Sequence, residues 1–427
     1  MEKFKQYENG LKLAVKQIPF VGSVALGVIV GVGSCLEDSK NNGYSHIVEH
    51  MLFKGTKKRT AKQISEELDA LGGNFNAFTS KENTCFYCKV LPDKLEEAAE
   101  LLSDIFFNAT LKEEELDRER KVIVEEILMD EDLPDDVCHD LLAEAFYGKN
   151  VLGRKVIGDM KNVENVHSSD LIAFKKKYYV SKNTCISFAG SIEPKKAEQI
   201  IEKYFLNNFD EERLDFRVTD IAKLPLNQEE RFLYRFKEVE QSHLALAFDS
   251  ISVENPNLIP FKVANIVFGG GMSSRLFQKI REENGLAYSV YSSLSAYVGN
   301  GYLELYLGTS PKNVGKAVDL LYEEINSFVK EGATTKEIER AKTQLKTSMV
   351  FATENPLSLM ISYGICYLFF GKSYDVEGKI SLIDKVDVKL ATDSFVESLN
   401  FAKCASVYVG KQCSDFDAVK RFLELKN

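Results

Sequence analysis

The sequence predicts an α+β fold of two homologous domains, each a mostly antiparallel or mixed β-sheet backed by helices. Short motifs recur along the 427 residues at an offset of about 220 residues. Strand-like and helix-like segments follow one another in mixed order within each copy. The segment from Asn207 to Glu230 breaks this periodicity. We therefore expect domains at residues 1–210 and 231–427, which are joined by a linker at 211–230.

The repeat is visible in four pairs of short segments. The matching segments begin at Leu91 and Ser310, Glu115 and Glu337, Gly148 and Gly371, and Ile186 and Ser406. A spacing of this length indicates two copies of a domain-sized unit, because solenoid repeats are only roughly 20–50 residues long. The 44% hydrophobic content is enough for a core in each copy.

Strand signals dominate the first 90 residues. Asn9-Gly10 predicts a tight turn into a strand, so we expect the fold to begin close to residue 1, with no room for a presequence. The apolar stretch Phe20–Val32 carries three glycines and is too short for the ~20 residues of a membrane span, so it predicts a buried strand. Gly73–Thr79 alternates like an edge strand, and Thr84–Val90 predicts another strand.

The run His46-Ile47-Val48-Glu49-His50 carries the clearest chemical signal. In a helix with ~100° per residue, both imidazoles point the same way and Glu49 lies beside them. Two imidazoles one turn apart are half of a zinc site, and zinc lowers the pKa of a bound water towards ~7. Glu49 is then placed to accept the proton of that water. The same pattern also fits an amphipathic helix whose histidines bind no metal.

We expect the third ligand to come from Lys112–Asp132, which is predicted to be a helix. Glu119 and Glu126 flank its apolar stripe two turns apart, whereas Glu125 points away from it. This geometry selects Glu126 over Glu125 as the third ligand. The alternative is an ordinary solvated helix, which most glutamate-rich helices are. The stripe consists of Leu116, Ile123 and Ile127.

The chain resembles the pitrilysin and mitochondrial processing peptidase family of zinc metallopeptidases, the inverted zincins with an H-x-x-E-H motif. The resemblance rests on His46-x-x-Glu49-His50 followed by Glu126, and on the runs HIVEHMLFKGTKKRT, LGGNFNAFTSKENTCFY, RERKVIVEEI and SSRLFQKIREENGLAYSVYS. It covers essentially the whole chain. It implies one Zn²⁺ per chain, held by His46, His50 and Glu126, with Glu49 as general base. It also implies that Glu119 supports catalysis by hydrogen bonding to a ligand.

The resemblance also implies residues that bind the peptide. Arg281 and Tyr288 match a family pair that holds the substrate and stabilises the developing oxyanion. Without the resemblance, Arg281 fits an exposed helix position and Tyr288 a strand core position. The strand residues Asn76, Ala77 and Phe78 match the family strand that takes up the peptide by main-chain pairing.

The second copy lacks the metal motif. No H-x-x-E-H occurs there, and Ala341 and Ser348 stand where the first copy has Glu119 and Glu126. Its glycine run, Gly269–Gly271, lacks the lysine of a phosphate loop and predicts a flexible lead into a helix. We therefore assign the metal chemistry to the first domain alone.

The resemblance implies a zinc-dependent endopeptidase that cleaves unfolded peptides or presequence-like segments. Long family members fuse two such halves, so a chain of this length implies a closed chamber formed by a homodimer, or by a heterodimer with a paralogue. Arg281 and Tyr288 of one chain would then face the zinc of the other. The main alternative is a non-catalytic structural or peptide-holding subunit, although no ligand or base has been lost. A hydrolase of small amides is disfavoured by the peptide-binding strand.

Charge and cysteine content narrow the compartment and the partners. The net charge of −10, from 54 basic and 64 acidic residues, argues against a nucleic-acid binder. Eight cysteines are scattered, and the metal-like pair Cys85 and Cys88 has no second pair to complete a site. We therefore expect reduced thiols, a cytoplasmic location and no membrane association.

Overall fold

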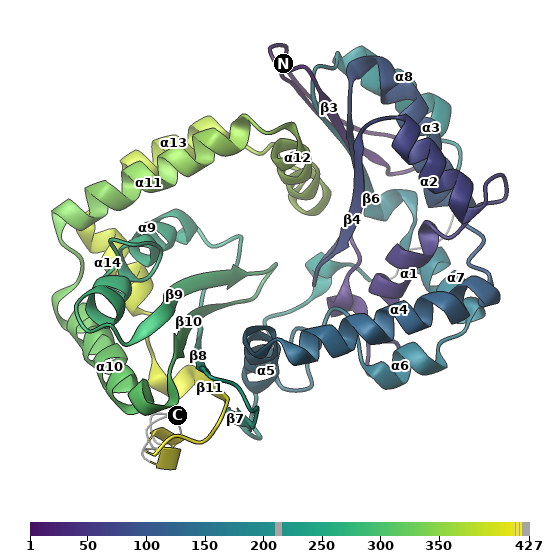
Figure 1. Cartoon of the computed structure of the whole chain (residues 1–427). Coiled ribbons are helices and arrows are strands. Elements are labelled where there is room, and N and C mark those ends of the chain that lie inside the picture. The colour runs from purple at the N-terminus through teal and green to yellow at the C-terminus, as the bar shows by residue number, and fades with distance from the viewer. Residues whose placement is uncertain (210–215, 415, 418, 421–427) are drawn as a thin grey trace. The chain divides into compact units, whose positions relative to one another are not determined.

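The computed structural model describes residues 1–209, 216–414, 416–417 and 419–420. Contacts divide the chain into two compact units, each with one β-sheet and its own helices (Figure 1). The predicted α+β class is therefore confirmed. No helix in the described part of the chain has the length and apolar character required to cross a membrane. Unit 1 consists of Met1–Ile127, Lys155–Asp220 and Val350–Tyr374, and unit 2 of Leu128–Arg154, Ile221–Met349 and Asp375–Asn427.

Unit 1 contains a six-stranded mixed sheet in the order β1-β2-β6-β3-β5-β4. Only β2 and β6 are parallel neighbours, and the other pairs are antiparallel. The predicted strands after the Asn9-Gly10 turn and within 20–32, 73–79 and 84–90 are all present, and β3 is buried along its whole length. The strands are β1 (Glu2–Gln6), β2 (Lys12–Gln17), β3 (Val24–Val30), β4 (Asn74–Thr79), β5 (Thr84–Val90) and β6 (Thr184–Gly190).

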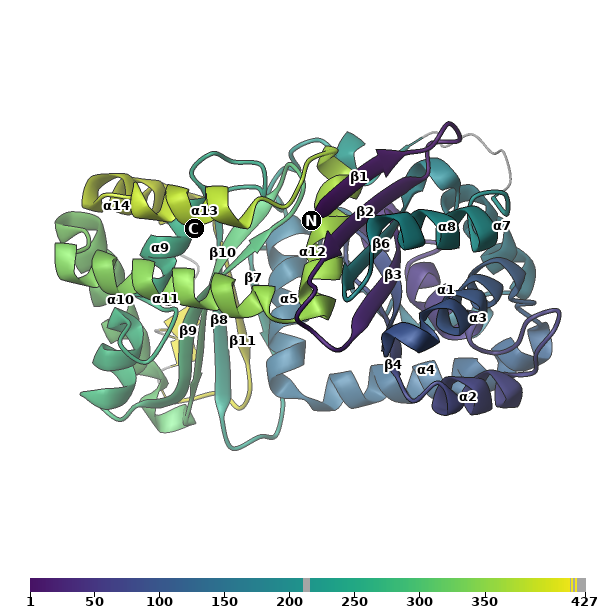
Figure 2. The same cartoon turned by 90° about the horizontal axis from the view of Figure 1, so that it is seen from above.

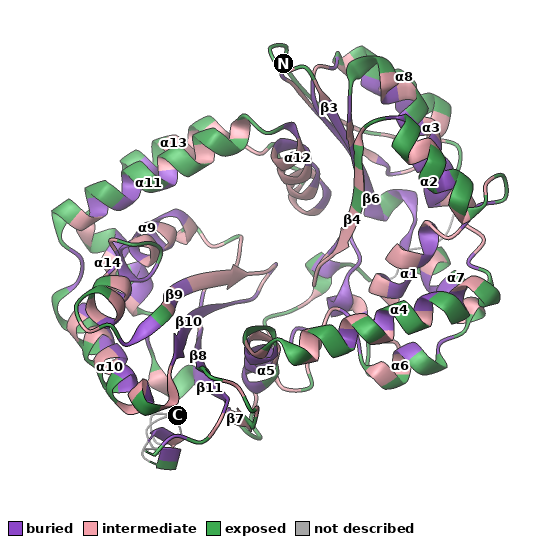
Figure 3. Cartoon of the chain, viewed as in Figure 1, coloured by how far each residue is buried: buried purple, intermediate pink, exposed green. Residues whose placement is uncertain are grey.

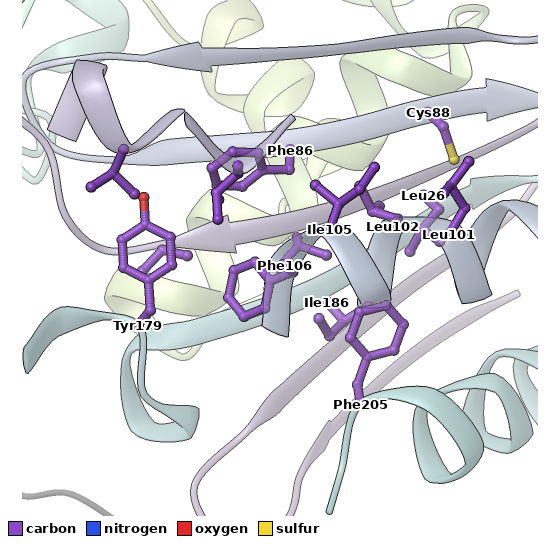
Figure 4. Close-up of a cluster of buried hydrophobic side chains, with 14 of the residues drawn as sticks. Leu26, Phe86, Cys88, Leu101, Leu102, Ile105, Phe106, Tyr179, Ile186 and Phe205 are labelled. Carbon is purple, nitrogen blue, oxygen red and sulfur yellow. The ribbon is translucent and has the colours of Figure 1, made fainter. Parts of the chain in front are cut away.

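Helices cover both faces of this sheet. One face packs against α1, α3, α4, α7 and α8 in the apolar cluster whose centre includes Phe86, Phe106 and Phe205 (Figure 4). The opposite face packs against α12 through Met360 and Tyr363 (Figure 2). The helices are η1 (Ser34–Leu36), α1 (Tyr44–Leu52), α2 (Ala61–Ala70), η2 (Pro92–Lys94), α3 (Leu95–Asn108), α4 (Glu113–Asp132, in unit 1 up to Ile127), α6 (Met160–Asn165), α7 (Ser168–Tyr178), η3 (Ser181–Asn183), α8 (Pro194–Tyr204), η4 (Val218–Asp220) and α12 (Pro356–Phe370).

Unit 2 contains a five-stranded sheet in the order β7-β11-β8-β10-β9. β7 and β11 are parallel, and the remaining pairs are antiparallel. This order and these directions repeat those of β2-β6-β3-β5-β4, so the predicted internal duplication is confirmed. The strands are β7 (Phe232–Arg235), β8 (Ser242–Asp249), β9 (Ala287–Ala296), β10 (Gly301–Thr309) and β11 (Cys404–Val409).

The unit 2 sheet also lies between helices. α9, α10 and α14 share an apolar cluster with one face, around Phe268, Phe328 and Phe395, and α5 packs on the other face against β8 and β11 (Figure 3). The glycine run leads into the helical segment η5, as expected. The helices are α5 (Pro134–Tyr147), α9 (Leu258–Phe268), the π-helix η5 (Phe277–Glu282), η6 (Pro311–Asn313), α10 (Val314–Glu331), α11 (Thr335–Thr353, in unit 2 up to Met349), α13 (Val376–Asp384), α14 (Val388–Val396) and η7 (Phe401–Lys403).

The compact units are not continuous in sequence. α5 follows α4 directly in the chain but belongs to unit 2, and α12 from the second half belongs to unit 1. The expected domains, residues 1–210 and 231–427, assign α5 to the first domain and α12 to the second. The sequence repeat could not reveal the exchange, because α5 and α12 occupy matching positions in the two copies. Of the expected linker, residues 211–215 lie outside the described residues, and 216–230 contain only η4.

Two glycines allow α12 to approach the sheet closely. A Cβ atom on Gly27 would lie 2.2 Å from Sδ of Met360, and one on Gly364 would lie 2.3 Å from Cδ1 of Ile29. The Ser187 hydroxyl on β6 also donates to the Met360 carbonyl at 2.6 Å. At Gly27 the flexible Met360 side chain would have to move, whereas a Cβ on Gly364 would also lie 2.8 Å from Cβ of Ser187 and would push the helix off the sheet.

Candidate metal centre

Helix α1 carries His46, Glu49 and His50, and a buried carboxylate defines its start. Oε2 of Glu37 accepts the N–H of Gly43, and Oε1 accepts the N–H of Ser45, both at 2.7 Å. Because Gly43 at the N-cap has no side chain, Glu37 supplies the acceptors that the first turn needs. Glu37 is only 2% exposed. These two hydrogen bonds hold the first turn of α1, which includes His46, in place.

The structure brings together the three residues chosen as ligands. Nε2 of His46 lies 3.8 Å and Nε2 of His50 lies 3.6 Å from Oε2 of Glu126. These distances are too long for hydrogen bonds. They are close to the roughly 3.3 Å between two ligand atoms on a tetrahedral zinc ion with bonds of ~2.0–2.1 Å. The ligand atoms of all three residues lie within 4.8 Å of one another, and Glu125 is exposed.

The electrostatics of the site suit a divalent cation. Burial, and to a smaller degree the neighbouring His50, lower the pKa of His46 to about 3. The imidazole of His46 is therefore neutral at pH 7, the form that ligates metal. Two imidazoles and one carboxylate form a donor set that fits Zn²⁺ and leaves a fourth position for water or substrate.

Glu119 contacts His50, one of the three residues chosen as ligands. Its Oε1 lies 2.9 Å from Nδ1 of His50, and its Oε2 lies 2.7 Å from Nζ of Lys54. Burial would raise the pKa of Glu119, but the hydrogen bonds from His50 and Lys54 outweigh burial and lower it. An ionised Glu119 is an acceptor for Nδ1–H, so the lone pair of Nε2 stays on the side of Glu126.

Glu49 lies on the same helix as His46 and His50 and forms a hydrogen bond with Thr79. The Thr79 hydroxyl, at the end of β4, donates to Oε2 of Glu49 at 2.5 Å. Burial raises the pKa of Glu49, and the hydrogen bond from Thr79 partly opposes that rise. A carboxylate with a raised pKa, held close to a metal site, is suited to exchange protons with water.

Strand β4 lies at the edge of the unit 1 sheet and pairs with β5. Asn76 is exposed on it, and Ala77 and Phe78 are partly exposed. An edge strand offers main-chain groups to an added strand. Thr79, the last residue of this strand, forms the hydrogen bond with Glu49, so the end of the edge strand lies next to Glu49.

Arg281 and Tyr288 lie together in unit 2, whereas the three residues chosen as metal ligands belong to unit 1. The Arg281 guanidinium donates to the Tyr288 carbonyl at 2.6 Å and lies 4.7 Å from the ring centroid of Phe277 and 4.8 Å from that of Tyr288. Tyr288 is 72% exposed at the start of edge strand β9. This exposure rules out the strand core position.

Two contacts of this site were not predicted from the sequence, those of Lys54 with Glu119 and of Thr79 with Glu49. Lys54 and Thr79 both occur in the motif runs, but neither had a role there. Lys54 follows His50 by four residues, and that spacing could have suggested a neighbour on the same side of the helix. The contact between Thr79 and Glu49 joins a helix to a strand 30 residues later, and local periodicity contains no signal for it.

Comparison with known proteins identifies related sequences. The family model described as Insulinase (Peptidase family M16) matches residues 12–160, and the model described as Peptidase M16 inactive domain matches residues 165–345. A Bacillus subtilis protein named "Uncharacterized zinc protease YmxG" is 38% identical over 399 residues, which cover 92% of this chain and 96% of that protein. A Rickettsia felis protein named as an uncharacterized zinc protease is 35% identical over 383 residues, covering 89% and 90%.

Solved structures share the fold. A protease from Helicobacter pylori matches with a TM-score of 0.88 and 20% identity, covering 96% of this chain and 99% of that one. A Pseudomonas fluorescens structure described as a peptidase M16 inactive domain matches with a TM-score of 0.87 and 21% identity, covering 96% and 98%. At such identities the likeness extends to the fold alone.

Proposed function

The chain belongs to the insulinase family of peptidases, M16, a family of zinc peptidases, and from this premise we propose that it is an endopeptidase acting on unfolded peptides or presequence-like segments. The observation that carries the proposal is the convergence of His46, His50 and Glu126, with Glu49 beside them. A zinc-binding protein without catalysis would not need Glu49 in that place.

His46, His50 and Glu126 would hold one zinc ion per chain. When bound, zinc supplies a Lewis acid for a peptide carbonyl and lowers the pKa of a water towards ~7. Glu49 accepts the proton of the attacking water and returns it to the leaving amine. Thr79 fixes one oxygen of the Glu49 carboxylate, so the base does not have to be oriented in each turnover.

The edge strand β4 accounts for binding of extended peptides. Main-chain pairing along Asn76, Ala77 and Phe78 gives affinity with little sequence preference. A folded protein keeps its strands paired internally and cannot add one here. This mode of binding favours unfolded peptides as substrates.

For the oxyanion we propose Tyr288, whose exposed side chain can donate a hydrogen bond to a tetrahedral intermediate, with Arg281 holding the peptide. We further propose that two chains, identical or paralogous, enclose the substrate. Arg281 and Tyr288 of one chain would then act at the zinc site of the other chain. A cytoplasmic location agrees with all eight cysteines being free thiols.

The peptidase proposal is tested with purified protein, by zinc analysis and by cleavage of an unstructured peptide with and without a chelator. We expect one zinc per chain and cleavage that the chelator abolishes. Glu49→Gln should keep the zinc and lose roughly 10²–10⁴-fold in kcat. Stoichiometric zinc with no cleavage would instead support a peptide-holding subunit.

The assembly is tested by mixing two inactive variants, Glu49→Gln and Arg281→Ala. If Arg281 acts on the partner's site, a mixed dimer contains one site with intact Glu49 and intact Arg281, and activity returns. Mixed dimers that form but stay inactive would show that Arg281 acts within its own chain.

A further inference from the structure

We propose that Lys54 is a positioning residue of the metal centre: its ammonium holds Glu119, and Glu119 holds His50 in the orientation that ligates the metal. This inference rests on the proposed function, because it assigns a role within that same zinc site. Nζ of Lys54 lies 2.7 Å from Oε2 of Glu119, and Oε1 of Glu119 lies 2.9 Å from Nδ1 of His50. The three side chains form a continuous chain of contacts.

The backbone of Lys54 is anchored to the helix that carries His50. The N–H of Phe53 donates to the His50 carbonyl at 3.3 Å, and the N–H of Lys54 donates to the Met51 carbonyl at 3.2 Å. Lys54 therefore leaves the last turn of α1 from a defined position. Its ammonium bridges α1 to α4, the two helices that supply all three ligands.

Glu119 needs this cation because its carboxylate is buried. The Glu119 side chain is 7% exposed and that of Lys54 is 33% exposed. A buried carboxylate that loses its charged partner keeps the cost of desolvation without the attraction that offsets it. Without Lys54, Glu119 gains by turning towards solvent, and that movement takes Oε1 away from Nδ1 of His50.

His50 needs Glu119 because an imidazole ring has two neutral tautomers. An acceptor at Nδ1 selects the Nδ1–H form, in which the lone pair is on Nε2, the atom 3.6 Å from Glu126. If the acceptor moves, the ring also populates the Nε2–H form, which cannot ligate through Nε2. Loss of such an outer hydrogen bond typically costs 10–100-fold in metal affinity.

Other lysines nearby lack this geometry. Lys58 is 66% exposed and lies 3.9 Å from Glu100, and Lys62 is 85% exposed in an i,i+4 pair with Glu66 at 3.6 Å. Exposed pairs of this kind contribute little. Lys62 therefore offers a matched control, a lysine close in sequence whose loss removes the same charge without touching the ligand chain.

The test compares Lys54→Met, Lys54→Arg and Lys62→Met with the wild type. Zinc affinity is measured by competition with a chromophoric chelator, and the tautomer of His50 is read in the zinc-free protein from ¹⁵N-histidine NMR. We expect Lys54→Met to weaken zinc binding by roughly 10–100-fold and to populate both tautomers of His50. Lys54→Arg should restore most of the affinity, and Lys62→Met should match the wild type.

At saturating zinc, Lys54→Met should lower kcat and leave the KM for peptide nearly unchanged. A folded Lys54→Met with wild-type zinc affinity and one His50 tautomer would overturn the proposal, as would a change confined to KM, which would place Lys54 on the substrate. If Lys54→Met does not fold, Lys54→Gln is judged by the same measurements. A wild type that binds no zinc would overturn the proposed function itself, whatever the variants do.

Discussion

Histidines in the two units differ in what their ring nitrogens contact. In unit 1, Nε2 of both His46 and His50 lies 3.6–3.8 Å from the Glu126 carboxylate, too far for a hydrogen bond. In unit 2, Nδ1 of His139 lies 2.6 Å from Oε1 of Glu304, and its Nε2 lies 3.2 Å from the Tyr291 hydroxyl. Both ring nitrogens of His139 are therefore engaged by the protein.

The second histidine of unit 2 is also engaged, since Nδ1 of His243 lies 2.6 Å from the Tyr306 hydroxyl. Imidazoles and a glutamate thus occur together in both units. In unit 1 the ligand atoms of His46, His50 and Glu126 lie within 4.8 Å of one another, close enough for one cation to contact all three. In unit 2 both ring nitrogens of His139 and Nδ1 of His243 already contact protein groups. The capacity to bind metal depends on which nitrogen atoms the fold leaves available, and residue composition alone does not decide it.

The helices at matching places in the two copies show the same contrast. α1 follows β3 and carries the H-x-x-E-H motif, whereas α9 follows β8 and is mostly apolar, with seven of its eleven residues buried. Along α11, Ala341 is buried at the place that Glu119 takes in α4. The second copy therefore keeps the packing role of these helices and lacks the ligands.

The largest expected effect is a loss of zinc affinity on substitution of Glu126 that substitution of its neighbour Glu125 does not produce. Glu126→Gln removes a ligand and should weaken zinc binding by more than the roughly 100-fold cost of losing an outer hydrogen bond. Glu125→Gln changes an exposed side chain and should bind zinc like the wild type. Zinc titration of both variants checks this, and equal affinities would remove Glu126 from the ligand set.

The next effect concerns the base. Thr79→Val removes the hydrogen bond to Glu49 while keeping the shape of the side chain, and the loss of a bond to a charged group costs about 1.5–3 kcal/mol. We expect kcat to fall roughly 10–100-fold with zinc affinity nearly unchanged, and Thr79→Ser to retain activity. Steady-state kinetics check this prediction, and a wild-type kcat in Thr79→Val would show that the hydrogen bond does not contribute to catalysis.

The two exchanged helices provide a smaller, structural contrast. α12 depends on the close approach at Gly364, so Gly364→Val should destabilise unit 1 by about 1–3 kcal/mol through overpacking against Ile29. Gly22 has open space around it, and Gly22→Val is the control. Urea unfolding followed by circular dichroism measures both. Equal midpoints would mean that the helix shifts to accept a side chain.

The smallest effect concerns α5, which contacts the sheet through His139 and Glu304. Burial lowers the pKa of His139, but the hydrogen bond to Glu304 and the charges of Asp135 and Asp136 outweigh burial and raise it. The contact therefore contributes fully below the unfolded pKa of 6.5 and is lost as pH rises through the higher folded value.

We expect hydrogen exchange in α5, corrected for the intrinsic effect of pH, to speed up in the wild type as the pH rises from below 6.5 through the raised folded pKa of His139. His139→Gln should lose this pH dependence. A variant that keeps it would show that another group controls the docking of α5.

Much of the local structure could be predicted from residue patterns. The apolar stripe of α4 is buried as expected, with Glu125 exposed, because a period of 3.6 residues decides which side chains share a helix face. The edge strand β4 and the buried strand β3 were predicted for the same reason, from the period of two and from a continuous apolar run. Duplication was visible because both copies keep those patterns.

By itself, the sequence determined the elements, their buried faces, the placement of His46, Glu49 and His50 on one helix, and Glu126 as the carboxylate that could join them. Only the tertiary structure decided how close Glu126 comes to the histidines, and that Lys54 contacts Glu119 and Thr79 contacts Glu49. It also decided that α5 packs on the sheet of unit 2 and α12 on the sheet of unit 1. The physical reason is that helix and strand periods specify directions over a few residues. Contacts between distant segments depend on the packing of the whole core.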